Sequence, residues 1–543
     1  MKTGGDLIVA CLKAQGVERV FSVPGESYLA VLDGLYESGI ENIVARQEGG
    51  AAMMAEAEGK LTGRPGIAMV TRGPGACNAS AGVHIAKQDS APMILFVGQI
   101  GRDMKGREAF QEVDYRAMFG DLAKWVEEID QVERIPEVIS HAYHVAMSGR
   151  PGPVVLALPE DMLRDLVDRE AGPRVEVASP APSKNEVGQF EELLKGAKSP
   201  LLLLGGSRWS DADIASVEGF AHRTGIPVGC TFRRHYLFDN EHPNYLGDIG
   251  FSAPPALSQA LEETDLLILL GCRFSEVPSG GFELLDIPKP QMKLVHIHPG
   301  AEELGRIYAP DLAINATPGG FLEAIEDLEC SFEVPVAGHQ SYLEYSKPKE
   351  ARGEIVDNQG VMAVLKDTLP RDTIMSNGAG NYAIWLQRFW HPHGIGSYLG
   401  PISGSMGYGL PAALAAKARY PERHVVAFAG DGCFQMTLQE FGTAVQNNLN
   451  VLVLVFDNAS YGTIRMHQEK RYPDRVSGTG LENPDFAAIA KAYGAFGERV
   501  EALSEFEPAL KRALASAGPA LLHIINDVEA ITPSASLSSL KMK

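Results

Sequence analysis

The stretch that decides the fold is VVAFAGDGCFQM, residues 425–436. It begins as an apolar strand, passes through Gly430-Asp431-Gly432 and continues into a predicted helix, about MTLQEFGTAVQNN. Taken alone, a carboxylate between two glycines is weak evidence, because Gly and Asp are ordinary turn residues. Its meaning therefore depends on the sequence around it.

The same pattern of apolar strand, Gly- or Pro-containing turn and amphipathic run recurs along the whole chain. The strands predicted in the first third are RVFSV, NIVAR, GIAMVT, PMILFVG and GPVVLAL. Those in the middle third are LLLLGG, IPVGCT, DLLILLG and KLVHIHP, and those in the last third are DTIMSNG, HVVAFAG, NVLVLVFD and ALLHIIND. Unbroken apolar strands that alternate with helices predict α/β domains with doubly wound parallel sheets. Ligands of such sheets bind beyond the carboxyl ends of the strands.

Two segments rich in Pro, Ser and charge are predicted linkers, residues 171–188 and 333–353. They divide a chain that is too long for one core into parts 1–170, 189–332 and 354–530. We therefore predict three doubly wound α/β domains of similar size. The tail SASLSSLKMK is expected to be loosely ordered.

The composition excludes several classes of protein. A net charge of −21 argues against a nucleic-acid-binding surface, which needs clustered Lys and Arg. The N-terminal stretch reads as an amphipathic helix and a strand, without a signal-peptide core, and no apolar run approaches the roughly 18 residues of a membrane span. Six cysteines without a CxxC spacing are predicted to be reduced, buried thiols: Cys11, Cys77, Cys230, Cys272, Cys330 and Cys433. We therefore expect a cytoplasmic enzyme that acts on small molecules.

Asp431 gains meaning from Asn458. The two residues are 27 positions apart (458 − 431), the length of one strand–turn–helix–strand unit. If the two strands are neighbours, both side chains lie at the same end of the sheet, where carboxylate and amide oxygens suit Mg²⁺. The glycines allow close backbone approach, and the following helix N-terminus favours an anion. The pair predicts a magnesium–diphosphate site. Gly430-Asp431-Gly432 alone would more often be an ordinary strand-to-helix turn without a ligand.

These motifs resemble a known superfamily. GDGCFQMTLQE followed by VFDNASYGTIRMHQE is similar to the signature of thiamine diphosphate enzymes, in particular the acetolactate synthase branch. The resemblance covers the whole chain, through RQEGGAAMMAEAEGKLTGRPG, TRGPGACNASAGVHIAKQDSAPMILFVGQ, AFQEVD and SGSMGYGLPAALAAK. It implies a thiamine-diphosphate- and Mg²⁺-dependent carboligase, a transferase or lyase resembling the large catalytic subunit. Such an enzyme decarboxylates a 2-oxo acid such as pyruvate and joins the remaining unit to a second carbonyl compound.

The resemblance also implies roles for individual residues. Glu48 matches the glutamate that hydrogen-bonds the cofactor's aminopyrimidine ring, a role that needs a proton held near neutral pH; otherwise it reads as a surface Glu at a helix start. Asp431, Asn458 and the backbone carbonyl of Ser460 are expected to hold Mg²⁺. Met406 matches the apolar wedge that keeps the cofactor bent, although such a Met is otherwise core filler.

Other residues are implied as cofactor contacts in the same way. They fall in the first third, which is then the pyrimidine-binding domain, and in the last third, which is the diphosphate-binding domain. A backbone contact to the cofactor's amino group is expected at Gly404. The remaining contacts are expected at Pro24, Pro74, Asn78, Ala379, Gly380, Asn381, Ser405, Gly430, Gly432, Cys433, Tyr461, Gly462 and Thr463.

Substrate-facing residues are implied by the AFQE motif. It places Phe110 and Gln111 beside the reactive carbon, while Lys124 lies roughly where a family lysine approaches the substrate, or is a solvated charge. The chain departs from the family at Glu26, where a second glycine is usual, so a carboxylate is expected near the pocket mouth. In the family the cofactor lies between two subunits, which implies a homodimer or homotetramer.

The sequence leaves open which nucleotide the central domain binds. Flavin-binding synthases have a GMHG-like turn, a GxRFDD stretch and an acidic strand end, where this chain reads GDIGFSAP, GCRFSE and VHIHPG. Arg273 matches the arginine of the GxRFDD stretch, but the acidic pair and the His-Gly turn are replaced. Two interpretations therefore stay open: FAD binding, and a different or vestigial nucleotide pocket. Two alternative functions also stay open: a 2-oxo acid or acyl-CoA decarboxylase or lyase, and a non-catalytic nucleotide-binding protein. The lack of paired active-centre histidines favours carboligation over plain decarboxylation.

Overall fold

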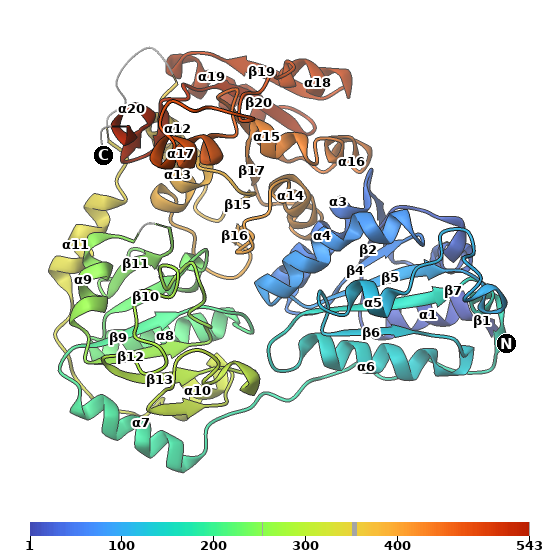
Figure 1. The fold of residues 1–543 in the computed structure, drawn as a ribbon, viewed down its shortest axis with the longest axis horizontal. Coiled ribbons are helices and arrows are strands. Elements are labelled where there is room, and N and C mark those ends of the chain that lie inside the picture. The colour runs from blue at the N-terminus through green and yellow to red at the C-terminus, as the bar shows by residue number, and fades with distance from the viewer. Residues whose placement is uncertain (252, 350–355, 542–543) are drawn as a thin grey trace.

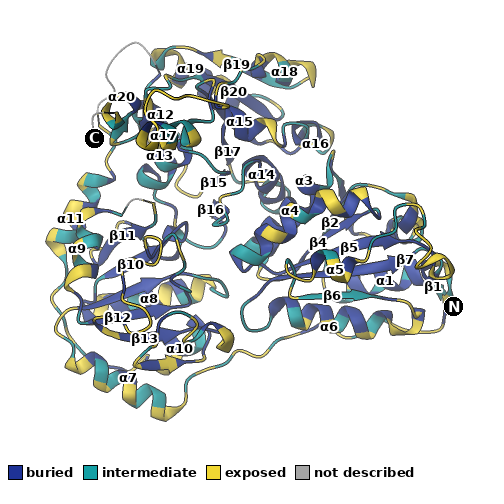
Figure 2. Ribbon diagram, viewed as in Figure 1, coloured by how far each residue is buried: buried dark blue, intermediate teal, exposed yellow. Residues whose placement is uncertain are grey.

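The computed structural model describes the chain except residues 252, 350–355 and 542–543. Three lobes are visible in Figure 1, and each is built on a six-stranded sheet in which every neighbouring pair is parallel. Helices cover both faces of the sheets, and the central strands of each sheet are almost entirely buried (Figure 2). The predicted fold class, three parallel α/β domains, is confirmed.

The N-terminal lobe has the strand order β3–β2–β4–β5–β7–β6. Its strands are β2 (Arg19–Ser22), β3 (Glu41–Val44), β4 (Gly66–Val70), β5 (Met93–Gln99), β6 (Trp125–Glu128) and β7 (Pro153–Pro159). Its helices are α1 (Gly4–Ala14), α2 (Leu29–Leu35), α3 (Glu48–Thr62), α4 (Pro74–Asp89), α5 (Tyr115–Phe119) and α6 (Ile135–Met147). A short ribbon pairs β1 (Lys2–Thr3) with β8 (Leu166–Val167).

The central lobe follows a different topology, β11–β10–β9–β12–β13–β14. Its strands are β9 (Pro200–Leu204), β10 (Val228–Thr231), β11 (Tyr245–Ile249), β12 (Leu266–Leu270), β13 (Lys293–Ile297) and β14 (Leu312–Ile314). Its helices are α7 (Lys184–Gly196), α8 (Asp211–Thr224), α9 (Pro255–Glu263), α10 (Pro318–Ala324) and α11 (Val336–Tyr345). In chain order this is the 3-2-1-4-5-6 sheet of dinucleotide-binding folds, with its switch point between β9 and β12.

The C-terminal lobe repeats the order of the N-terminal lobe, as β16–β15–β17–β18–β20–β19. Its strands are β15 (Ile374–Asn377), β16 (Tyr398–Leu399), β17 (Val425–Gly430), β18 (Leu452–Asp457), β19 (Phe496–Val500) and β20 (Ala520–Ile525), with a ribbon of β21 (Ala530–Thr532) and β22 (Ala535–Ser536). Its helices are α12 (Asn358–Thr368), α13 (Tyr382–Phe389), α14 (Gly409–Arg419), α15 (Asp431–Gln435), α16 (Glu440–Gln446), α17 (Gly462–Arg471), α18 (Phe486–Ala492), α19 (Leu503–Leu514) and α20 (Leu537–Leu540).

Several expectations about local structure are wrong. Of the single helix expected over MTLQEFGTAVQNN, only the later part forms, as α16, because α15 ends at Gln435, before this stretch. The turn between the two helices is tethered where the Thr437 hydroxyl donates to the Gly407 carbonyl (2.7 Å). The linker predicted at 333–353 contains α11, which packs beside β11 and α9. The tail expected to be loose forms β22 and α20 with Leu537 buried, while its residues 542–543 lie outside the described part.

The N- and C-terminal lobes share one apolar core. It joins α3 and α4 to α14 at the centre of Figure 1, where small side chains such as Ala52, Ala55 and Ala413 let the helices approach closely. The central lobe lies beside this pair, connected by residues 171–183, which form neither helix nor strand. The domain boundaries stay a prediction, and position 354 lies outside the described residues.

The cysteines only partly match expectation. All six are free, and four are buried, but Cys330 is half-buried and Cys77 is exposed. Cys77 lies in the first turn of α4, on the side that leaves the core. Among the described residues, no helix is long and apolar enough to cross a membrane.

Candidate functional site

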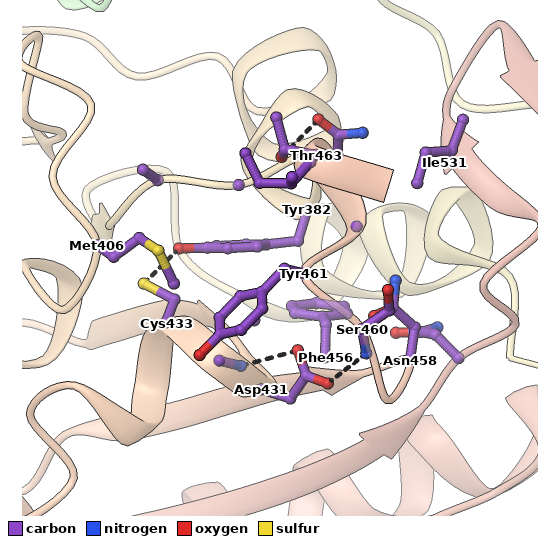
Figure 3. Close-up of a pocket in the computed structure, with 18 of the residues that line it drawn as sticks. Tyr382, Met406, Asp431, Cys433, Phe456, Asn458, Ser460, Tyr461, Thr463 and Ile531 are labelled. Carbon is purple, nitrogen blue, oxygen red and sulfur yellow. Dashed lines mark hydrogen bonds between the residues drawn. The ribbon is translucent and has the colours of Figure 1, made fainter. Parts of the chain in front are cut away.

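A cavity of about 260 Å³ opens at the carboxyl edge of the C-terminal sheet (Figure 3). Strands β17 and β18 are neighbours, with Gly430 opposite Phe456 in their register. Asp431 and Asn458 follow these strands directly and both line the cavity. The spacing argument therefore predicted the correct juxtaposition.

Most residues predicted in the last third meet at this cavity. The lining includes Ala379, Gly380, Asn381, Gly404, Met406, Gly430, Asp431, Gly432, Cys433, Asn458, Ser460, Tyr461, Gly462 and Thr463. Ser405 is not part of the lining, but its backbone carbonyl packs against Gly378, directly behind the cavity wall. The sequence did not single out the rest of the wall, which is Asn358, Tyr382, Trp385, Phe456, Ile464, Asn526, Ala530 and Ile531.

Asp431 is the buried anion of the cavity. Its Oδ1 accepts the Gly432 N–H (2.8 Å), and its Oδ2 accepts the Ser460 N–H (3.2 Å) (Figure 3). Burial raises its pKa to about 6, and the nearby carboxylate of Asp457 acts in the same direction. A divalent cation at this position would hold the carboxylate in its ionised form.

A polar network behind Asp431 escaped the sequence analysis. Asn483 donates from Nδ2 to Asp431 Oδ2 (2.8 Å) and to Asp457 Oδ1 (2.7 Å). Burial would raise the pKa of Asp457, but its hydrogen bond with His523 (2.8 Å) and others lower it overall. The network holds two carboxylates close together, so that Asp457 stays ionised while Asp431 faces the cavity. No local pattern marks Asn483, which lies 52 positions from Asp431 in the chain.

Two glycines of the motif make room for aromatic rings. A Cβ at Gly430 would lie 2.8 Å from the Tyr382 ring, and one at Gly432 would lie 2.5 Å from the Tyr461 ring. Tyr382 also donates its hydroxyl to Cys433 Sγ (3.1 Å). Any larger residue at either glycine would displace a wall of the cavity.

The opposite wall is a loop with left-handed backbone. Gly404 has φ of 66°, a conformation that favours glycine, and Met406 follows it into the cavity. The Gly407 N–H donates to Cys433 Sγ (3.1 Å), which fastens this loop to α15.

The residues predicted in the first third gather elsewhere, at the carboxyl edge of the N-terminal sheet. Asn78 Nδ2 donates to Glu48 Oε2 (2.9 Å), which joins the N-terminal ends of α3 and α4. Pro74 is the first residue of α4, and Pro24 lies exposed in the loop after β2. None of these residues lines the C-terminal cavity.

The AFQE segment lies at the same edge. A Cβ at Gly73 would lie 2.8 Å from Gln111 Cβ, so Gln111 packs directly on the turn before α4. Phe110 is 74% exposed, which is unusual for an aromatic side chain. Glu26 forms an ion pair of 3.5 Å with the buried Arg72, which also binds Glu160 (2.7 Å). Glu26 therefore stands at this edge as a partly neutralised carboxylate.

Lys124 occupies a different place from that implied by the resemblance. Its Nζ donates to the backbone carbonyls of Val145, Ser148 and Arg150 at 2.6, 2.8 and 2.8 Å. These carbonyls close the end of α6, so the amine serves as a helix C-cap. It is not directed at the residues around Glu48.

A second cavity, about 320 Å³, lies over the switch point of the central sheet. Arg273 lines it but donates from Nη2 to the Gln88 carbonyl (2.8 Å), and burial lowers its pKa to about 10. His298 stands at the end of β13, where a flavin site of the resembled type has an acidic residue. The first turn of α8, which does not line this cavity, is capped by Ser210 and contains Asp211 and Asp213, which disfavours a phosphate at that helix end. These residues do not fit FAD, and Ser252 of the GDIGFSAP stretch lies outside the described part.

The chain matches three family models in order. They are the thiamine pyrophosphate enzyme N-terminal TPP binding domain over residues 2–118, the central domain over 187–325 and the C-terminal TPP binding domain over 378–524. The chain, with its three parallel-sheet lobes, is thus a thiamine pyrophosphate enzyme. The cofactor of this class is thiamine diphosphate with its usual Mg²⁺, and the polar side chains that follow β17 and β18 belong to its C-terminal binding domain.

Curated relatives narrow the class. The acetolactate synthase isozyme 2 large subunit of Escherichia coli (strain K12) is 32% identical over 98% of this chain and 97% of its own length. A probable acetolactate synthase large subunit of Methanocaldococcus jannaschii is 31% identical, covering 96% and 92%. The Corynebacterium glutamicum large subunit is 30% identical, covering 94% and 84%. The chain belongs to the acetolactate synthase large-subunit family, and the resemblance inferred from the motifs is confirmed.

Proposed function

We propose that this chain decarboxylates a 2-oxo acid such as pyruvate and joins the remaining acyl unit to a second carbonyl compound. The observation that carries the proposal is the pairing of Asp431 and Asn458 at the ends of adjacent strands, in a cavity of a family whose members are acetolactate synthases. Thiamine diphosphate supplies the nucleophilic carbon and the electron sink for this chemistry. The protein supplies positioning and electrostatics.

The C-terminal cavity suits the diphosphate and its cation. Asp431 Oδ, the Asn458 side-chain oxygen and the Ser460 carbonyl would provide hard oxygen ligands for Mg²⁺, which keeps phosphate oxygens and water as its other ligands. Asp431 is the one carboxylate among the described residues that lines the cavity, which fits this role. No cluster of three or more His, Cys, Asp or Glu side chains able to hold a metal occurs among the described residues, and the proposed ligand set does not require one. Met406 would support the bent cofactor from the opposite wall.

Proton transfer in this proposal belongs to Glu48. Its Oε2 accepts a hydrogen bond from Asn78, and the backbone that follows it is held by Gln47, whose Oε1 accepts the N–H groups of Gly49 (2.6 Å) and Gly50 (3.2 Å). A carboxyl group held this firmly can exchange a proton with a bound ring without losing its orientation. Gln111, on the same edge, would contact the substrate.

The separation of the two halves supports a shared site. The cavity that would hold the diphosphate has no lining residue from the N-terminal lobe, so Glu48 would serve the cofactor of another subunit. Large apolar side chains near both halves are left exposed, including Phe110, Met436 (50%) and Ile464 (55%). These exposed apolar groups support the proposal of an interface between subunits at this place. The proposed assembly is a homodimer or homotetramer in the cytoplasm.

Turnover of a panel of 2-oxo acids with thiamine diphosphate and Mg²⁺ tests the reaction. The expected result is acetolactate from pyruvate, or the corresponding ligation product from another acid. Aldehyde and CO₂ alone would instead establish a decarboxylase. Glu48→Gln should lose most turnover while it still binds cofactor, whereas Glu133→Gln, an exposed change in the same lobe, should not. If Glu48→Gln behaves as wild type, the catalytic assignment is wrong.

A further inference from the structure

Arg233 lies in the wall between the cofactor cavity and the cavity of the central lobe. It follows β10 and is 4% exposed. Its neighbours Phe232 and Arg234 line the central cavity, and Gly404 lines both cavities. Arg233 therefore brings a charge from the central lobe to the rear of the diphosphate-binding loops.

The guanidinium holds two of these loops. Nη2 donates to the Gly378 carbonyl (3.0 Å), and Nη1 donates to the Pro401 carbonyl. Gly378 immediately precedes the Ala379–Asn381 turn, and Pro401 opens the loop that carries Gly404 and Met406. One side chain thus fixes two opposite walls of the cavity relative to each other.

Only one layer of residues separates this charge from the cavity. A Cβ at Gly378 would lie 2.5 Å from Cys433 Sγ, 3.2 Å from the Tyr382 hydroxyl and 3.3 Å from the Ser405 carbonyl. Cys433 and Tyr382 themselves line the cavity. Arg233 is therefore close enough to act electrostatically on an anion bound there.

The charge has no anionic partner in the described chain. Both Nη atoms donate to backbone carbonyls and not to a carboxylate, and the buried Nε has no hydrogen-bond partner among the described residues. The Phe232 ring, 4.9 Å away, is a weak substitute. The residue also adopts a left-handed backbone with φ of 59°. A buried unpaired charge and a strained backbone are both costly, and such costs concentrate at functional sites.

We propose that Arg233 is a positioning residue of the cofactor site. Its unpaired positive charge is balanced by the negative charge of the bound diphosphate. The carbonyl contacts align the two loops, and the positive charge favours an anion in the cavity they enclose. A purely structural link between lobes would need neither the strained backbone nor an unpaired cation. The inference rests on the family's cofactor and extends it to a residue of the central lobe.

Equilibrium binding tests this without any turnover. The variants are Arg233→Met, which removes contacts and charge, and Arg233→Lys, which keeps the charge. Arg371→Met is the matched control, since Arg371 also links the C-terminal lobe to the central lobe, through Asp239, but is 58% exposed. The dissociation constants of thiamine diphosphate and of inorganic diphosphate, each with Mg²⁺, are measured by calorimetry, with melting temperatures of the free proteins.

Arg233→Met is expected to weaken both ligands roughly fivefold to tenfold, as expected for a charge acting across one residue layer. Arg233→Lys should recover most of the affinity, and Arg371→Met should match wild type. The proposal is overturned if Arg233→Met binds both ligands as wild type does, or if the Lys variant is as weak as the Met variant. Should Arg233→Met fail to fold, the Lys variant decides: wild-type-like affinity supports the charge, and tenfold loss refutes it.

Discussion

Asp248→Asn is expected to remove much of the pH dependence of stability above pH 5. Asp248 lies in β11 of the central lobe, one residue before its end, and accepts a hydrogen bond from Gln387 of α13. The carboxyl is 9% exposed, and burial raises its pKa to about 7. Asparagine keeps an acceptor for Gln387 but cannot ionise, so the substitution isolates the effect of the charge.

The sign follows from proton binding. Because the folded pKa is raised, the unfolded chain releases this proton first, and stability is lost as the pH rises from about 4 to about 7. One pKa unit corresponds to about 1.4 kcal/mol, so the full loss relative to an unfolded pKa of about 3.9 is about 4 kcal/mol. About 1.5 kcal/mol of it is already lost at pH 5. The stability gap between variant and wild type should therefore widen by about 3 kcal/mol between pH 5 and pH 8.

The assay is calorimetric melting of both proteins at pH 5 and pH 8. A gap of about 3 kcal/mol corresponds to a difference of roughly 10 °C for a unit of domain size, with the variant higher at pH 8. Glu262→Gln on the adjacent α9 is the control, since this exposed residue should leave the pH dependence unchanged. A gap that stays constant from pH 5 to pH 8 would show that Asp248 is ionised in the folded protein and that the reasoning is wrong.

Three further predictions concern single contacts. Lys124→Met should lower the melting temperature by a few degrees but leave kcat within about twofold of wild type, since the amine caps α6. A tenfold loss of kcat would instead mean that Lys124 acts on the substrate. Gly66→Ala should cost at least about 3 kcal/mol in urea unfolding, since its Cβ would lie 1.9 Å from the Ala55 carbonyl oxygen, and wild-type stability would contradict the packing. Glu440→Gln should lower kcat about tenfold at saturating cofactor, because Glu440 accepts the Arg46 N–H (3.2 Å) beside the turn that presents Glu48; unchanged kcat would mean that the turn holds without it.

Local patterns were sufficient where burial is uniform along a segment. Central strands such as β5, β12 and β17 are buried along their whole length, so they appear in the sequence as unbroken apolar runs. Most of the strands that were missed, β6, β11, β14, β16 and β19, lie at sheet edges. Strands β6 and β19 contain half-buried or charged residues, and β16 is only two residues long, so the apolar signal is short or broken.

The sequence by itself determined the class of sheet, the motif at Gly430–Gly432 and the pairing of Asp431 with Asn458. These depend on residue type and spacing within a single strand–helix–strand unit, where the chain itself fixes the geometry. Only the tertiary structure decided which distant groups complete the site. Asn483 reaches Asp431 across 52 positions, and Arg233 reaches Gly378 across 145. The physical reason is that hydrogen bonds and charge act through space, and nothing in the local periodicity of an asparagine or arginine indicates the strand end it will meet.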